Sequence, residues 1–225
     1  MKFLMIALAI AYPVIAHIAV VSRGVAATVA SLAVLVSLAL LPRLVALNVV
    51  AWCVLPVVVA GLLWLAHSSA AWLPLYAMPV FVNLFGAWIF GHTLARGKVP
   101  LIERLARLLH EGDGITDEIA RYARKVTITW TVFLSGLAVL NLTLALLAAP
   151  DGVLLMIGVQ PIVAVPVEVW SLFANFIDYV LAGLLFLAEY AYRLRKFPQQ
   201  PYRNFFDFIN RARRVGHRVI GERRP

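Results

Sequence analysis

The chain has 225 residues, of which 63% are hydrophobic and 14% are charged, and its formal net charge is +9. A soluble domain is nearer half apolar and a quarter charged, so this composition argues against an ordinary water-soluble globular protein. The apolar excess is more than one soluble core of this size can bury, which predicts that lipid solvates many of these side chains. The basic residues flank apolar segments, as at a membrane surface, so we expect no nucleic-acid partner.

The N-terminal segment resembles a secretory signal peptide, because Lys2 precedes an apolar run. Val14 and Ala16 would suit the two small-residue positions of a cleavage site. Against cleavage, the apolar run continues to Val21 and is long enough to cross a bilayer. We therefore expect this segment to be retained as a membrane helix.

Six apolar stretches are long enough to span a membrane. They are Phe3–Val21, Val25–Leu41, Leu44–Ala66, Trp72–His92, Val126–Ala149 and Trp170–Tyr192. Backbone groups in lipid must be hydrogen-bonded within the spanning structure, so each continuous apolar run predicts a helix and not a barrel strand. The expected fold is an all-α polytopic transmembrane bundle over residues 1–192, followed by a basic tail over residues 193–225.

The positions of the basic residues predict the orientation. If the N-terminus is inside, every Lys and Arg except Arg23 falls in an inner segment. Because basic loops stay on the cytoplasmic side of a membrane, we expect both termini of the chain in the cytoplasm.

The inner loop, residues 93–125, contains an amphipathic pattern. An apolar stripe recurs at helical spacing through Leu101, Ile102, Leu105, Leu108 and Leu109. This stripe predicts a cytoplasmic helix lying on the inner leaflet, starting near Pro100 and ending before the glycines at 112 and 114. A second helix, capped by Thr116 or Asp117, should lead into the fifth span.

The outer segment, residues 150–169, contains a short apolar stretch from Val153 to Val165. The stretch is too short to cross as a helix, and Pro161 and Pro166 interrupt the sequence around it. We interpret it as a re-entrant or interfacial segment.

The C-terminal tail combines aromatic and basic residues. Phe205, Ile209, Ala212 and Val219 can share one helical face, with several arginines directed away from it. This pattern predicts an interfacial helix that binds anionic lipid.

Polar side chains within the spans are the best functional leads, because they are costly in lipid. On the sixth span, Asn175, Asp178 and Glu189 form a polar stripe. Other intramembrane polar residues are His17, Asn83 and Asn141. One interpretation is a proton or substrate relay; the other is hydrogen bonding between helices, with Glu189 pairing with inner-face arginines.

Catalytic residues are hard to find in this chain. His92 with Glu189, both near the inner surface, is the one acid–base pair that can be proposed for an acyltransferase. Cys53, the single cysteine, has no base near it in sequence, and we expect it to pack in the core. No metal or cofactor motif is present, so we expect neither.

Four stretches together resemble one family. They are AYPVIAH at 11–17, GHTLARGKVPLIERLARL at 91–108, ARYARKVTITWTVF at 120–133 and WSLFANFIDYVLAGLLFLAEYAYRLRKFP at 170–198. The family consists of uncharacterised bacterial inner-membrane proteins, often encoded in gene clusters for aryl-polyene or xanthomonadin-type pigments. Its members are sometimes labelled ketosynthase, but that activity needs a reactive Cys with His partners, which this chain lacks.

The resemblance implies a multi-pass accessory protein of the inner membrane, acting in synthesis, anchoring or hand-over of an acyl or polyene lipid. Its expected partners are membrane lipids and either an acidic acyl carrier protein or other proteins of pigment or lipid biosynthesis. The basic inner-face residues would bind the carrier protein, or they bind lipid headgroups alone; they are Arg104, Arg107, Arg121, Arg124 and Lys125. The alternative functions are a small transporter or flippase that uses the polar stripe, and an intramembrane acyltransferase.

Overall fold

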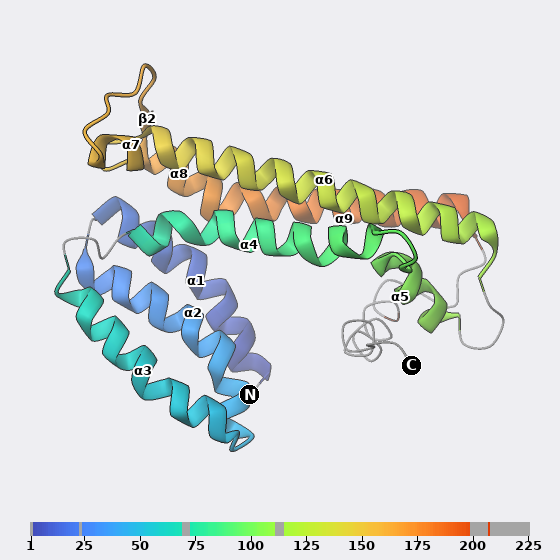
Figure 1. Cartoon of the computed structure of the whole chain (residues 1–225), viewed down its shortest axis with the longest axis horizontal. Coiled ribbons are helices and arrows are strands. Elements are labelled where there is room, and N and C mark those ends of the chain that lie inside the picture. The colour runs from blue at the N-terminus through green and yellow to red at the C-terminus, as the bar shows by residue number, and fades with distance from the viewer. Residues whose placement is uncertain (1, 23, 69–72, 111–114, 199–206, 208–225) are drawn as a thin grey trace. The chain divides into compact units, whose positions relative to one another are not determined.

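The computed structural model describes residues 2–22, 24–68, 73–110, 115–198 and 207, and it confirms the predicted all-α fold. Within these residues, six helical segments are long and apolar enough to cross a membrane, so the chain is a multi-pass membrane protein (Figure 1). The first five are α1 (Lys2–Ser22), α2 (Val25–Val45), α3 (Val49–Ala66), α4 (Leu73–Gly91) and α6 (Asp117–Leu147). The sixth consists of α8 (Val167–Leu172), the π-helical turn η2 (Phe173–Ile177) and α9 (Asp178–Lys196).

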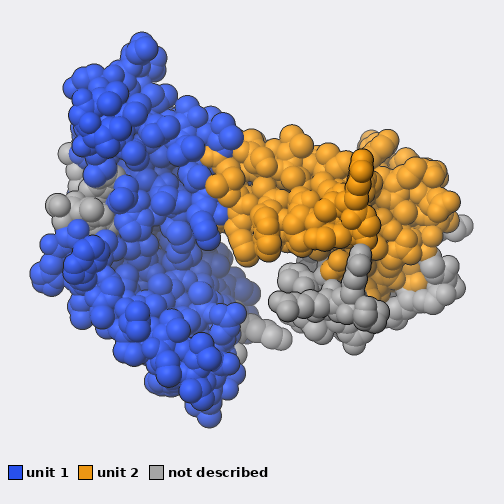
Figure 2. Space-filling model, in the orientation of Figure 1, with its two compact units in different colours: residues 1–81, 139–180 blue, residues 82–138, 181–225 orange. Residues whose placement is uncertain are grey.

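The chain divides into two compact units (Figure 2). Unit 1 contains Met1–Phe81 and Val139–Val180, and unit 2 contains Val82–Ala138 and Leu181–Pro225. Helices α4, α6 and α9 therefore each contribute residues to both units. Residues 1–192, which we predicted to be one transmembrane domain, are thus divided between the two units.

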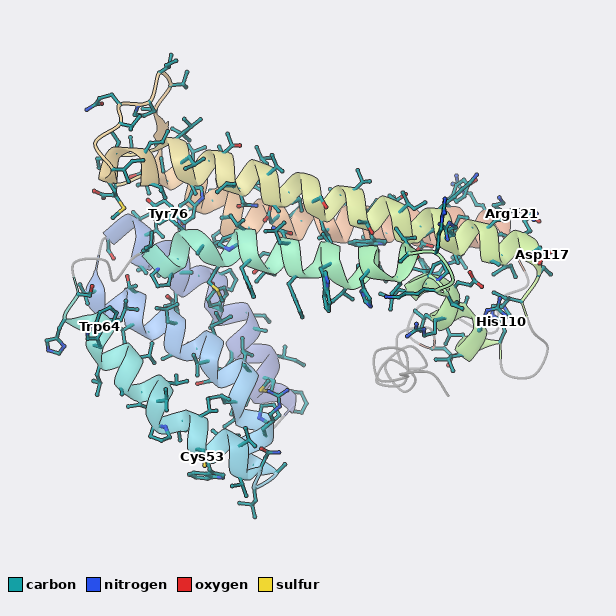
Figure 3. The ribbon with its side chains drawn as sticks, viewed as in Figure 1. Cys53, Trp64, Tyr76, His110, Asp117 and Arg121 are labelled. Atoms are coloured by element: carbon teal, nitrogen blue, oxygen red, sulfur yellow. The ribbon has the colours of Figure 1, made fainter. Side chains whose placement is uncertain are left out.

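The core of unit 1 forms around an aromatic pair. Trp170 of α8 is fully buried and stacks on Tyr76 of α4, with ring centroids 4.0 Å apart and planes 9° apart (Figure 3 labels Tyr76). Small residues surround the pair, including Ala19, Ala145 and Ala148. Small side chains let transmembrane helices approach closely, which suits packing in lipid, where apolar surface gains little by association.

Helix α3 lies at the edge of unit 1 beside α2 and is almost entirely exposed. Cys53 and Trp64 project from it (Figure 3), and Trp64 is 72% exposed. The prediction that Cys53 packs in the core is therefore wrong. In a membrane protein an exposed apolar helix faces lipid, so burial of Cys53 in the protein is not needed to keep its side chain out of water.

The connection between α2 and α3 also differs from the prediction. Helix α2 continues through Pro42 and Arg43 to Val45, whereas Pro42–Arg43 was the predicted inner loop. The turn comes later, at Leu47, which has a positive φ of 53°. Asn48 was predicted to lie inside the third span, but its Oδ1 accepts a hydrogen bond from the Ala51 N–H and caps α3.

The two ends of the outer segment between α6 and α8 lie side by side. Strand β1 (Ala148–Ala149) pairs in parallel with β2 (Val165–Pro166), and the short helix α7 (Val153–Met156) lies between them. A Cβ at Gly152 would clash with the Ala148 carbonyl oxygen, so glycine is required there. The segment therefore does not cross the membrane, and its aliphatic residues Ile157, Ile162 and Val163 are exposed.

In unit 2, helix α5 (Leu101–Leu109) forms where the amphipathic stripe predicted it. The 3-10 turn η1 (His92–Leu94) precedes it, and the Thr93 hydroxyl accepts a hydrogen bond from the Leu101 N–H at 3.0 Å. Leu109 is buried, and Leu105 of α5 and Phe186 and Tyr190 of α9 pack against it. This part of the stripe is therefore covered by protein, whereas we predicted that it lies on the inner leaflet.

The second predicted loop helix is confirmed as the first turns of α6. Thr116 accepts a hydrogen bond from the Ile119 N–H at 3.3 Å and caps the helix, which then continues unbroken for 31 residues. The predicted tail helix with Phe205, Ile209, Ala212 and Val219 lies outside the described residues, as do the glycines at 112 and 114.

Candidate functional site

Unit 2 contains an open groove of about 730 Å³ between the first turns of α6 and the last turns of α9. Both helices contribute charged, aromatic and aliphatic side chains. The lining residues are Glu118, Arg121, Tyr122, Lys125, Val126, Thr129, Trp130, Leu185, Ala188, Glu189, Tyr192 and Lys196. This volume is in the range of sites that bind small molecules.

The groove changes from charged to apolar along its length. Its charged end includes Arg121, near the start of α6 (Figure 3), and Lys196 at the end of α9. Its apolar end includes Trp130 on α6 and Leu185 on α9. Lys196 and Leu185 are separated by roughly 16 Å at 1.5 Å per residue. This gradient matches a molecule with an ionic head and a hydrocarbon chain.

An ion pair connects the two helices at the charged end. Lys196 Nζ lies 3.4 Å from Glu118 Oε1. The same ammonium lies 5.7 Å from the centre of the Tyr122 ring and 5.5 Å from that of Phe197. Lys196 is therefore held over aromatic faces as well as beside a carboxylate, as a cation–π contact requires.

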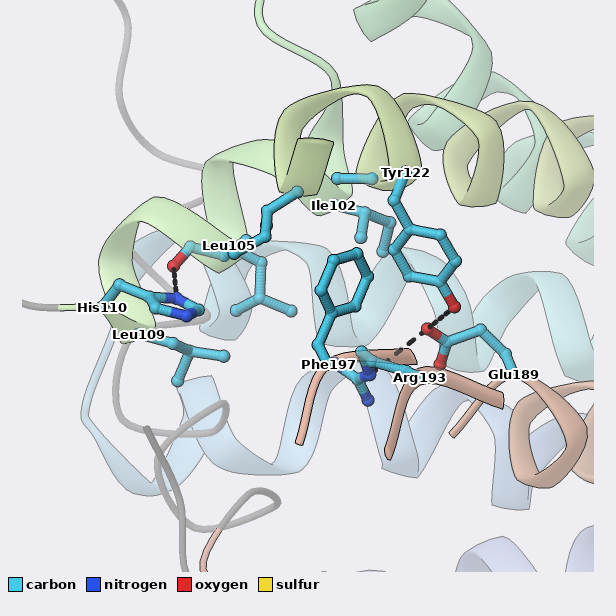
Figure 4. A pocket seen from close by; sticks show the side chains of 11 residues that line it. Ile102, Leu105, Leu109, His110, Tyr122, Glu189, Arg193 and Phe197 are labelled. Carbon is cyan, nitrogen blue, oxygen red and sulfur yellow. Dashed lines mark hydrogen bonds and ion pairs between the residues drawn. The ribbon is translucent and has the colours of Figure 1, made fainter. Parts of the chain in front are cut away.

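A second, much smaller cavity of about 40 Å³ lies beneath α5 (Figure 4). Its apolar side is formed by Ile102, Leu105, Leu109 and Phe197, among others. The cavity has room for a few water molecules but not for a substrate.

Glu189 and Tyr122 line both the groove and the cavity beneath α5. The Tyr122 hydroxyl donates to Glu189 Oε1 at 3.1 Å, and Arg193 Nε lies 3.3 Å from the same oxygen (Figure 4). These contacts agree with the interpretation of Glu189 as a partner of inner-face arginines. Its carboxylate is already engaged by two partners, which favours a structural role over proton relay.

The structure does not bring His92 to Glu189. His92 is exposed, its Nδ1–H donates to the Trp88 carbonyl at 2.8 Å, and its ring stacks on Trp88. His92 lines neither the groove nor the cavity beneath α5. The acid–base pair that was the candidate for acyltransferase chemistry therefore shares neither of the two spaces described in unit 2.

Unit 1 contains a buried polar network that starts from His17. His17 Nδ1 lies 2.9 Å from Ser171 Oγ, and Asn175 Nδ2 donates to the same oxygen at 3.1 Å and to the Ser171 carbonyl at 2.9 Å. Ser171 is completely buried. Because Ser171 Oγ accepts from Asn175, its hydrogen is available to His17 Nδ1 in the tautomer that carries its hydrogen on Nε2.

A second buried contact in unit 1 joins α6 to α9. Asn141 Nδ2 donates to Asp178 Oδ2 at 2.7 Å, and both side chains are buried. His17, Asn141, Asn175 and Asp178 thus belong to unit 1, as does Ser171. Glu189 and the buried Asn83 belong to unit 2, so the predicted stripe does not form one network within either unit.

The π-helical turn η2 contains Asn175 of the first buried contact and is followed directly by Asp178 of the second. It runs from Phe173 to Ile177, and the Asp178 N–H bonds to the Phe173 carbonyl, five residues back. A π turn adds a residue to the helix and shifts the direction of the side chains that follow, and such turns are common at functional sites. Sequence reasoning missed both this turn and Ser171, since a single serine in an apolar span carries no signal of its own.

The predicted basic residues do not all have the same role. Arg121 and Lys125 are exposed and line the groove. Arg124 is exposed and donates to the Leu94 carbonyl at 3.4 Å. Arg107 is paired with Glu103 on α5, and neither Arg107 nor Arg104 lines the groove.

Among the described residues, no group of three His, Cys, Asp or Glu side chains is placed to hold a metal ion. Comparison of the chain with protein-family models, curated proteins and solved structures finds no match.

Proposed function

We propose that the protein is an accessory protein of the bacterial inner membrane that holds an acyl or polyene lipid and hands it over during its synthesis or anchoring. The observation that supports this function is the groove between α6 and α9, which is charged at one end and apolar at the other. The two walls of the groove, α6 and α9, belong to two of the six candidate spans, so lipid is the expected neighbour of the groove. The resemblance to inner-membrane proteins of pigment gene clusters supports the same proposal.

The chemistry of the groove favours binding over catalysis. Both carboxylates of the groove are engaged, Glu118 by Lys196 and Glu189 by Tyr122 and Arg193, which leaves neither of them free to act as a general base. An apolar chain gains little by leaving lipid for protein, so recognition must come from the shape of the groove and from its charged end. A carrier that accepts and releases a chain needs only these features.

We further propose that the exposed basic residues near the groove receive an acidic acyl carrier protein. Arg121, Arg124 and Lys125 lie on α6 within two helical turns, and charge complementarity would steer such an encounter. The alternative is that they bind lipid headgroups alone. A carrier-protein pulldown that stays negative with the loop intact would remove the docking proposal.

The test of the function is a clean deletion in the native host, followed by lipid and pigment profiling of both membranes. We expect the acyl or polyene product to be lost from its normal membrane, and its precursor to accumulate. Complementation with the intact gene should restore the product, and a Trp130→Ala/Leu185→Ala variant, altered at the apolar end of the groove, should not. An unchanged lipid and pigment profile in the deletion strain would overturn the proposal.

A second function, a small transporter or flippase, is favoured by the buried Asn141–Asp178 contact beside a π turn. Ionisable groups inside spans and interrupted helices both occur along transport pathways. Asp178→Asn should then abolish export of the product, and unchanged export would remove this candidate.

A further inference from the structure

We propose that the Glu118–Lys196 ion pair closes the charged end of the groove, and that the ligand is a lipid with an anionic headgroup that displaces Glu118 from Lys196. This inference rests on the proposed function, because it names the headgroup of the lipid that the groove holds. In this mechanism the Glu118 carboxylate pairs with the Lys196 ammonium while the groove is empty, and the anionic headgroup takes its place when the lipid binds. We call Glu118 in this role the placeholder.

The position of the pair supports a closing role. Glu118 lies in the first turn of α6 and Lys196 is the last residue of α9, so their contact bridges the two walls of the groove at its charged end. Both side chains remain partly exposed, at 58% for Glu118 and 34% for Lys196. Exposed ion pairs are weak, so a ligand with a better-placed anion can break this one without disturbing the helices.

The charges that line the groove favour an anion once Glu118 has moved. Arg121, Lys125 and Lys196 supply the cations, and Glu118 and Glu189 supply the carboxylates. Glu189 is already held by Arg193 at 3.3 Å. Displacing Glu118 therefore leaves three cations facing the headgroup, and charge-assisted hydrogen bonds to phosphate or carboxylate oxygens are the strong ones.

The apolar end fixes the direction of the ligand. Trp130 and Leu185 line the groove at the end away from Lys196. A lipid with its headgroup at Lys196 would lay its chain along these side chains, toward the hydrocarbon region. Trp130 is therefore placed to report on the chain, and Lys196 to report on the headgroup.

The test uses the full-length protein in nanodiscs of phosphatidylcholine that contain a rising fraction of phosphatidylglycerol with brominated acyl chains. Bromine quenches tryptophan fluorescence at contact, and the signal of Trp130 is obtained as the difference between the protein and its Trp130→Phe variant. We expect quenching of Trp130 to saturate as phosphatidylglycerol rises. Brominated phosphatidylcholine in place of brominated phosphatidylglycerol should quench Trp130 much less.

Three variants distinguish displacement of Glu118 by the headgroup from a general effect of net charge on lipid binding. Glu118→Gln should lower the half-saturating phosphatidylglycerol fraction by about two- to fivefold, the range expected from loss of one exposed ion pair. Lys196→Gln should raise it by a similar factor. Asp117→Asn removes the same charge from the neighbouring residue, whose side chain does not line the groove, and should leave it unchanged.

Each outcome decides between the two proposals. If Glu118→Gln and Asp117→Asn shift the curve equally, or if Glu118→Gln weakens binding, the placeholder is wrong. If brominated phosphatidylcholine and phosphatidylglycerol quench Trp130 equally, the groove binds lipid without regard to headgroup charge, and the proposed function stands without this inference. If neither lipid quenches Trp130, no chain occupies the groove, and the proposed function fails with it.

Discussion

The hydroxyl of Tyr122 donates a hydrogen bond to Glu189 at 3.1 Å, and these two side chains separate the groove from the small cavity beneath α5. The polar part of the wall between the two spaces therefore includes this hydrogen bond and the Glu189–Arg193 ion pair. A ligand in the groove would lie against a polar wall that is fixed from both helices, so the groove should keep its width when it is empty.

Loss of this hydrogen bond should destabilise unit 2. Tyr122→Phe leaves the Glu189 carboxylate with one partner fewer, and we expect a loss of about 1 kcal/mol in the free energy of unfolding. Thermal unfolding in detergent, followed by circular dichroism, measures it. Tyr192→Phe is the matched control: Tyr192 stacks on Tyr122 with ring centroids 5.9 Å apart, but no hydrogen bond of its hydroxyl is present among the described residues. Equal losses for the two variants would mean that the hydroxyl of Tyr122 contributes nothing specific.

Removal of the buried hydroxyl in unit 1 should also be measurable. Ser171→Ala leaves His17 without its hydrogen-bond partner and Asn175 with the Ser171 carbonyl alone. Interhelical hydrogen bonds in membranes contribute about 0.6–1.7 kcal/mol, and we expect a loss in that range. Ser37→Ala serves for comparison, because within the part of the chain that the structure describes the Ser37 hydroxyl bonds back to the Ala33 carbonyl of its own helix. Reversible unfolding in mixed detergent should show Ser37→Ala close to the unmodified protein, and a Ser171→Ala protein of unchanged stability would contradict the role of the network.

Asp178→Asn removes the carboxyl group of this residue but keeps a side chain of nearly the same shape. The amide oxygen can still accept the hydrogen bond that Asn141 donates at 2.7 Å, so we expect the variant to fold and to reach its normal level in the membrane. Loss of product export in this variant would then report on the carboxyl group itself. Asp178→Leu, which removes the acceptor, should lower the amount of folded protein, measured by size-exclusion chromatography after extraction. If Asp178→Asn fails to fold as well, the hydrogen bond to Asn141 needs a carboxylate.

The close approach of Gly152 to Ala148 makes a further prediction. Gly152→Ala would place a methyl group against the Ala148 carbonyl and push apart the β1–β2 pair, at a cost of about 1–3 kcal/mol. Limited proteolysis of purified protein should cut the outer segment faster in this variant. Gly183→Ala, where an added Cβ meets nothing within 4 Å, is expected to leave the cleavage rate unchanged.

Site-specific labelling tests the predicted orientation. In a Cys53→Ser background, we expect Ile162→Cys to react with a membrane-impermeant maleimide in spheroplasts, because Ile162 is fully exposed on the outer segment. Lys98→Cys, in the inner loop, should react only after lysis. Labelling of both sites in sealed spheroplasts would mean that the inner loop and the outer segment lie on the same side, which contradicts the positive-inside assignment.

The spanning helices could be predicted because a long apolar run leaves the backbone few alternatives in lipid. Their ends were less certain, as α2 shows: Pro42 and Arg43 look like a loop, yet helix continues through them. Proline is tolerated within transmembrane helices because neighbouring groups satisfy the freed carbonyl. Hydropathy alone therefore misplaced the turn by a few residues.

Part of the candidate site was visible in the sequence, and part was not. Arg121, Lys125 and Glu189 were identified from charge and position, and they line the groove. Trp130 was not identified, because an aromatic residue in a span is usually interpreted as a core residue or as an anchor at the membrane interface. Glu118 and Lys196 come from helices far apart in sequence, and nothing local indicates that they meet. Pairings of this kind depend on how the helices pack, which composition does not specify.

The length of α6 has a consequence for how a water-soluble enzyme would meet this protein. Its 31 residues extend for about 46 Å, whereas the hydrocarbon layer is about 30 Å thick. The turns from Asp117 to Lys125 would then lie in the headgroup layer or on its aqueous side. The charged end of the groove, which these turns help to form, would lie there too. A soluble enzyme could thus reach a headgroup bound there from the aqueous side, without itself entering the bilayer.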